Sequence, residues 1–122
     1  MIKPSAFCQD IKLLQQEAAN LERQFKEPEA LNRYSRIAEM NPKDLPALVK
    51  CTELNCSIGN RTPDKNAKKR YYLAAGDYAQ KAYIVDSASA DANYAMALVA
   101  GKMTEVEEEK KKIVEFVNLS KI

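Results

Sequence analysis

Residues 29–44, which read EALNRYSRIAEMNPKD, constrain the fold of this chain more than any other stretch. They are amphipathic at helical spacing, so they predict a helix with one buried face. Pro42 ends that helix, because proline has no amide hydrogen and clashes with the preceding turn. Asp44 then stands where the side chain of a new helix cap is expected. The stretch therefore predicts two helices joined by a tight turn.

The composition favours an all-helical protein. Charged residues make up 30% of the 122 residues, and only three glycines occur. The long stretches are rich in Ala, Leu, Glu, Lys and Gln, as in helical proteins. A chain of this length builds one core, so residues 1–122 are expected to form a single domain. The net charge of +2 is too small for bulk charge to select a partner.

Several classes of protein are not expected. No apolar run approaches the roughly 18 residues of a membrane helix, and no signal peptide opens the chain, so a cytoplasmic protein is predicted. Cys51 and Cys56 would lie about 140° apart around a helix, which disfavours a disulfide framework, and Cys51 is interpreted as a buried small residue. Because the chain has no histidine and no close cysteine pair, neither a metal site nor a cofactor is predicted.

The first hairpin is predicted over about residues 11–42. Its first helix carries an apolar stripe at spacings of three and four, and the stripe is too short for an independent coiled coil, so core packing is favoured. Pro28 suits the first turn of its second helix, which should end near Asn41. The members of the stripe are Phe7, Ile11, Leu14, Ala18, Leu21 and Phe25.

The second hairpin is predicted over about residues 45–86. Asp44 caps its first helix, and Gly59 is expected to end it. Thr62 is expected to cap the second helix, which continues to about Val85, where Gly76 is a candidate kink. The expected core positions are Leu48, Cys51, Leu54, Asn55 and Ile58, then Ala67, Tyr71, Ala74, Tyr78, Ala82 and Val85.

The third hairpin is predicted over about residues 90–122. Ser87 or Ser89 caps a fifth helix that ends at Gly101, and Thr104 with Glu107 forms a capping box that opens a sixth. No cap or proline follows Ile122, so we expect the chain to be the N-terminal part of a longer repeat protein. The apolar face of the sixth helix is Val106, Ile113, Phe116, Val117 and Ser120.

The spacing of Ala30, Tyr34 and Pro42 resembles the second helix of a tetratricopeptide repeat (TPR). Leu14 with Ala18, and Met96 with Ala97, resemble the large and small positions of first helices in that family. The long second hairpin and the extended final helix are also similar to divergent repeats of the regulator-of-microtubule-dynamics type and related bacterial proteins. The resemblance implies a right-handed stack of three helix hairpins, with six helices in all.

The resemblance also implies a function and a site. Repeat proteins of this kind are non-enzymatic scaffolds that bind a peptide or helix in a concave groove lined by the first helix of each hairpin. The residues required to clamp a chaperone tail are replaced here, for example by Gln15, Ala19 and Asp91, so that ligand is not expected. The groove residues implied for this chain are Lys12, Gln15, Glu22, Val49, Glu53, Tyr94 and Leu98.

An enzyme is not expected, because no histidine, phosphate-binding glycine loop or activated nucleophile is evident. The acidic pairs between Glu105 and Glu109 resemble paired catalytic carboxylates. However, Glu107 with Lys111 and Glu108 with Lys112 have the spacing of surface ion pairs, so a solvated helix face is preferred.

Two further surfaces remain open. One basic cluster is followed by Tyr71 and Tyr72 and offers an alternative function, the binding of a nucleic acid or an anionic surface. Residues 106–122 hold more large apolar side chains than one helix face buries, so a homodimer through this segment is expected. The basic cluster is Lys65, Lys68, Lys69 and Arg70.

Overall fold

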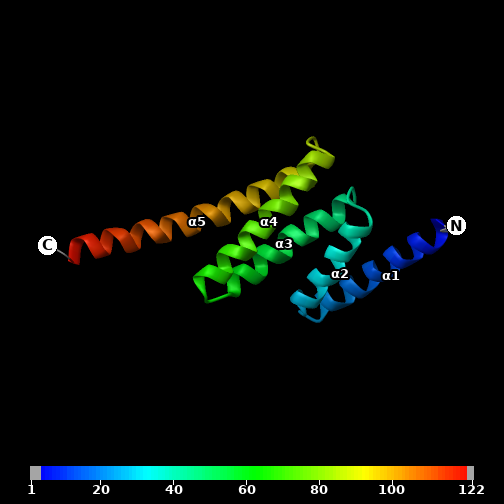
Figure 1. Cartoon of the computed structure of the whole chain (residues 1–122), viewed down its shortest axis with the longest axis horizontal. Coiled ribbons are helices and arrows are strands. Elements are labelled where there is room, and N and C mark those ends of the chain that lie inside the picture. The colour runs from blue at the N-terminus through cyan, green and yellow to red at the C-terminus, as the bar shows by residue number, and fades with distance from the viewer. Residues whose placement is uncertain (1–3, 121–122) are drawn as a thin grey trace.

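The computed structural model describes the backbone of residues 4–120 and the side chains of residues 8–119. Within that range the chain is all-α and has five helices (Figure 1). The side chains of Phe7 and Ser120, and Ile122 as a whole, lie outside the described residues. The helices are α1 (Pro4–Arg23), α2 (Glu27–Met40), α3 (Leu45–Arg61), α4 (Lys65–Val85) and α5 (Ala90–Ser120).

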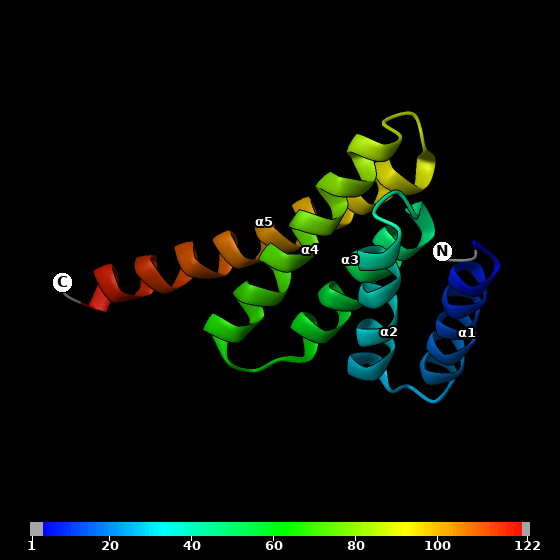
Figure 2. The ribbon, with the colours of Figure 1, turned by 45° about the vertical axis from the view of Figure 1, so that its right-hand side comes forward.

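The helices stack in chain order, and α3 holds the central place. Each helix packs on the next one along the chain, and α3 also packs on α5. Because α1 packs closely only on α2, it forms one end of the stack (Figure 2). The first half of α5 runs beside α4, whereas its second half extends beyond the rest of the molecule in both views (Figures 1 and 2). None of the described helices is both long enough and apolar enough to cross a membrane.

The first hairpin follows its sequence pattern. Pro28 lies in the first turn of α2, and Ala30 and Tyr34 are buried where that helix packs on α1 and α3. Phe25 departs from the expected stripe: α1 ends at Arg23, and Phe25 lies in the turn with a φ of 59° and a side chain that is 89% exposed. The core shared by α1, α2 and α3 is Leu14, Ala18, Ala30, Tyr34, Ile37, Ala47, Cys51 and Leu54.

Side-chain caps begin the later helices. The carboxylate of Asp44 accepts a hydrogen bond from the Ala47 amide at 3.1 Å, as expected. Asp64, not Thr62, caps α4 by accepting from the Ala67 amide at 3.0 Å. Ser89 is the residue of the predicted pair that caps α5, since its hydroxyl accepts from the Ala92 amide at 3.3 Å. Each cap satisfies an amide that has no partner within its own helix.

The expected end of α3 at Gly59 is wrong. The helix continues to Arg61, and Thr62 follows it, with its hydroxyl donating to the Ile58 carbonyl at 2.7 Å. Gly59 is buried inside the helix because the ring of Tyr72 in α4 lies directly against it. Gly59 thus permits a close approach between two helices and does not end one.

The buried face of α4 also differs from the expected stripe. Its buried residues are Tyr72, Ala75, Ala79 and Ala82, so only Ala82 of the predicted positions is fully buried. The reason is that α4 packs on both α3 and α5, which centres its buried face between those two neighbours. Tyr71, Ala74 and Tyr78 are left half-buried at the edge of that face, and Val85 is exposed.

The fifth and sixth helices of the sequence analysis form one helix, α5, so the expected count of six is wrong for the described chain. No proline separates the two halves, and a glycine such as Gly101 weakens a helix interior by only about 1 kcal/mol. Thr104 caps nothing: its hydroxyl donates to the Ala100 carbonyl at 2.8 Å, as hydroxyls within helices often do. The predicted third hairpin over residues 90–122 is therefore wrong for the described chain, because this segment is one helix that packs on α3 and α4.

Candidate partner-binding groove

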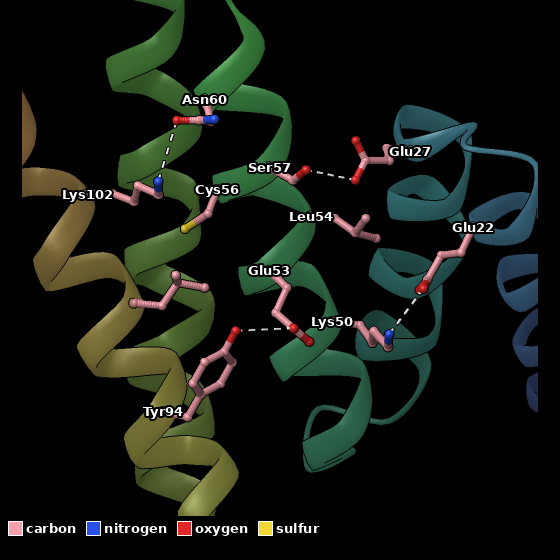
Figure 3. A pocket seen from close by; sticks show the side chains of 11 residues that line it. Glu22, Glu27, Lys50, Glu53, Leu54, Cys56, Ser57, Asn60, Tyr94 and Lys102 are labelled. Atoms are coloured by element: carbon pink, nitrogen blue, oxygen red, sulfur yellow. Dashed lines mark hydrogen bonds and ion pairs between the residues drawn. The ribbon is translucent and has the colours of Figure 1, made fainter.

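An open groove of about 370 Å³ lies on the face where the end of α1, the start of α2, α3 and α5 come together (Figure 3). Successive turns of α3 supply Lys50, Glu53 and Ser57, which recur at helical spacing along one face. From the opposite side, α5 supplies Tyr94, Leu98 and Lys102 at intervals of one turn. The remaining lining residues are Glu22, Glu27, Leu54, Cys56 and Asn60.

Ion pairs hold the end of the groove nearest α1 and α2. Lys50 Nζ lies 3.1 Å from Glu22 Oε2 and so ties α3 to α1. Glu27, at the start of α2, pairs with Arg61 and accepts a hydrogen bond of 2.8 Å from the Ser57 hydroxyl. These contacts neutralise two of the three carboxylates that line the groove.

Weaker polar contacts join α3 to α5. The Tyr94 hydroxyl donates to Glu53 Oε2 over 3.5 Å, the long limit of a hydrogen bond. Lys102 donates to Asn60 Oδ1, also at 3.5 Å, and lies 3.6 Å from Glu105 Oε2. Figure 3 shows the Tyr94 hydroxyl pointing toward the Glu53 carboxylate across the groove.

The surroundings shift the pKa of several groups near the groove. Burial raises the pKa of Tyr94, and the neighbouring Glu53 carboxylate raises it further. Burial likewise raises the pKa of the Cys56 thiol to about 11, although nearby Lys102 opposes the shift. Behind the groove, burial and the Glu22 carboxylate raise the pKa of Tyr34. The tyrosines and the thiol are therefore neutral near pH 7, and the fixed charges of the groove are its carboxylates and ammonium groups.

The structure brings four of the seven predicted groove residues together: Glu22, Glu53, Tyr94 and Leu98 line the groove. Gln15 instead lines a separate hollow beside Tyr34 and Pro46, and Lys12 is exposed on α1 away from the groove. Val49 is not available to a partner, because it is only 8% exposed and packs in a core cluster with Ala82 and Ala92.

Sequence reasoning missed several lining residues. Lys102 lies one turn after Leu98, so extending the 94–98 spacing by four residues finds it. Ser57 follows Glu53 at the same interval, and Asn60 follows Ser57 by three residues. The spacing rule does not find Glu27, because Glu27 is the first residue of α2 and not part of α3 or α5. The turn after α1 is what places it at the groove.

The basic cluster is divided between two surfaces. Lys65, Lys68 and Lys69 border a hollow whose other wall includes Glu107 and Glu109 of α5. Arg70 borders a different hollow with Asn55 and Tyr71. The four charges therefore do not all line one hollow, and the α5 wall beside three of them carries two carboxylates together with Lys110.

Within the described residues, no group of three or more His, Cys, Asp or Glu side chains is placed to hold a metal ion. The ion pair formed in the charged part of α5 joins Lys111 to Glu108 at 3.7 Å, three residues apart. The spacing of four expected for Glu107 with Lys111 and Glu108 with Lys112 is not the one adopted. The carboxylates between Glu105 and Glu109 are exposed on α5, so they do not form a buried pair.

The groove lies within the part of the chain that a known family covers. The family model described as "Regulator of microtubule dynamics protein 1-3" matches residues 13–121. The chain belongs to this family. Searches among curated proteins and among solved structures gave no match. The match to the regulator of microtubule dynamics family includes every residue that lines the groove, as well as α2 to α5 in full.

Proposed function

We propose that this domain is a non-enzymatic scaffold of the TPR-like kind, which binds a segment of another protein in the groove between α1, α3 and α5. The occupant is an extended peptide or a helix. The observation that carries the proposal is that helices from successive hairpins line one continuous hollow with Tyr94 and Leu98 on its wall. Tyr94 is 48% exposed although it is a large aromatic residue, which is typical of a residue that anchors a partner.

The membership of the regulator of microtubule dynamics family and the stacking of helix hairpins both support this proposal. Repeat proteins built in this way use their concave face to bind extended partners. A hollow of about 370 Å³ accepts a few side chains, so the partner is recognised through a short motif. We infer a protein partner because the groove combines an aromatic residue and a leucine with several hydrogen-bonding groups.

A selection from a random peptide library displayed on phage tests the proposal. Peptides selected on the wild-type domain are re-tested on the double variant Tyr94→Ala/Leu98→Ala and on the control Leu73→Ala. Leu73 is a matched control because it is 51% exposed on α4 and lies outside the groove. We expect binders that the double variant loses and the control keeps. Equal binding to all three proteins would remove the groove from consideration.

The alternative partner is a nucleic acid or an anionic surface bound by Lys65, Lys68, Lys69 and Arg70. It is the weaker proposal, because Glu107 and Glu109 oppose three of those charges. Titration with single-stranded nucleic acid at increasing salt decides it, since phosphate contacts give an affinity that falls steeply with ionic strength. Salt-sensitive binding that Lys68→Ala/Lys69→Ala abolishes would favour the alternative.

A further inference from the structure

The charges of the groove do not balance, and the imbalance is localised. Lys50 pairs with Glu22, Arg61 pairs with Glu27, and Lys102 pairs with Glu105 beyond the groove. Glu53 differs: among the described side chains no lysine or arginine forms an ion pair with it. From the side chains that the structure describes, its carboxylate accepts only the long hydrogen bond of the Tyr94 hydroxyl. One carboxylate therefore remains without a cation at the centre of the groove.

Tyr94 is positioned to share in binding a cation. Its hydroxyl points toward Glu53 from the facing helix, so the phenol end of its side chain meets that carboxylate across the groove (Figure 3). A cation that reaches Glu53 also meets the Tyr94 hydroxyl, and the aromatic ring behind that hydroxyl attracts a cation that approaches its face. Leu98, one turn further along α5, offers an apolar surface for the aliphatic stem of a long side chain.

The same arrangement disfavours an anionic ligand. The two ammonium groups of the groove, on Lys50 and Lys102, already have carboxylate partners. An anion that recruits either lysine must compete with Glu22 or Glu105, and it also enters the field of Glu53. Charge complementarity therefore selects a positively charged group.

We propose that the groove recognises its protein segment through a lysine or arginine side chain, whose cationic head pairs with Glu53 beside the Tyr94 ring. This inference rests on the proposed function, because it names the chemistry of the segment that the groove binds. Arginine suits the site well, since its planar guanidinium forms paired hydrogen bonds with a carboxylate and also stacks on an aromatic ring. The stem of the basic side chain lies against Leu98.

The peptide selection described above supplies the first test. Among the peptides that Tyr94→Ala/Leu98→Ala loses, we expect lysine or arginine to be enriched at one aligned position. One such peptide is then synthesised, and its affinity is measured by fluorescence anisotropy. Glu53→Gln should weaken binding by up to about fivefold, the effect of losing a partly exposed ion pair. The matched control is Glu39→Gln, which removes an exposed carboxylate of α2 outside the groove.

A charge reversal separates recognition from structural damage. Glu53→Lys should lose the basic peptide and gain affinity for the same peptide with glutamate in place of its basic residue. The Tyr94→Phe variant keeps the ring and removes the hydroxyl, so it should bind better than Tyr94→Ala. Urea unfolding of each variant checks that the fold is intact. Because Glu53 is partly exposed, its substitutions are expected to leave the unfolding midpoint almost unchanged.

The outcomes distinguish this inference from the function on which it rests. If peptides depend on Tyr94 and Leu98 but show no basic position, or if Glu53→Gln binds them as well as Glu39→Gln does, the inference is overturned and the scaffold function survives. If no peptide depends on the groove, both are overturned.

Discussion

Gly59 of α3 lies so close to Tyr72 of α4 that a Cβ atom added at Gly59 would be 2.8 Å from Cε1 of the ring. Tyr72 is among the most deeply buried side chains, so its ring has no free space to move into. The close packing of α3 on α4 thus depends on the missing side chain at position 59.

The first prediction compares two glycine substitutions. Gly59→Ala should lower the free energy of unfolding by up to about 2 kcal/mol, because overpacking costs about 1–3 kcal/mol against roughly 1 kcal/mol gained in helix propensity. Gly101→Ala should raise it by about 0.5–1 kcal/mol, since a Cβ atom there meets no neighbour within 4 Å. Urea unfolding of both variants measures the difference. A stabilised Gly59→Ala protein would show that α3 and α4 are further apart than described.

The second prediction concerns thiol reactivity. Cys8 is exposed, whereas Cys51 and Cys56 are buried. Burial raises the pKa of Cys51 to about 12 and that of Cys56 to about 11, so neither provides the reactive thiolate near pH 8. A colorimetric thiol reagent should therefore modify one cysteine quickly in the folded protein and all three in urea. The control Cys8→Ser should remove the fast phase, and a persisting fast phase would contradict the burial of the other two.

The third prediction follows from the same pKa shifts. The folded pKa of Cys51 and of Cys56 lies above the ordinary value of 9.0, so the folded state holds these protons more tightly than the unfolded state does. Their contribution to stability is complete below about pH 9 and is lost as the pH rises toward 11–12. The free energy of unfolding should decline over that range. Cys51→Ala should make the decline shallower, and an unchanged slope would assign it to other groups, such as the buried tyrosines.

The fourth prediction addresses the second half of α5. Ile113, Val114, Phe116 and Leu119 are exposed there, and Phe116 is 73% exposed. We propose a homodimer through residues 106–122, because covering three such side chains contributes roughly 5–9 kcal/mol before the entropic cost of association. Sedimentation equilibrium should show a concentration-dependent dimer that Phe116→Glu abolishes. Phe25→Glu, in the turn after α1, is the matched control and should still dimerise.

A strict monomer across the micromolar range would remove this dimer. A dimer that Phe116→Glu leaves intact would move the interface to another surface of the molecule.

The parts of the fold that local signals determine were predictable. Pro28 and Asp44 act within one turn of their own positions, so the sequence alone located the starts of α2 and α3, and it narrowed the cap of α5 to Ser87 or Ser89. The buried face of α4 was not predictable in the same way. Its buried residues, Tyr72, Ala75, Ala79 and Ala82, lie beside the predicted stripe, and the choice between these adjoining faces is made by two neighbours, α3 and α5, which the local pattern does not reveal.

The candidate site shows the same division. Tyr94 and Leu98 were found because residues four apart share a helix face, and they line the groove together. Val49 was placed in the groove by its repeat position, yet it is buried in the cluster that includes Ala92 of α5. The orientation of α5 on α3 determines which of these side chains a partner can reach. That orientation depends on how all the helices pack together, so the local sequence does not reveal it.

The two outer walls of the groove, α1 and α5, do not pack on each other, and α1 is joined to α3 across the groove edge by the Lys50 to Glu22 ion pair. The width of the groove therefore depends on how the hairpins twist relative to α3. An occupant that touches both walls resists that twisting. A partner that bridges α1 and α5 would therefore connect two helices that do not pack on each other and would stiffen the stack as a whole.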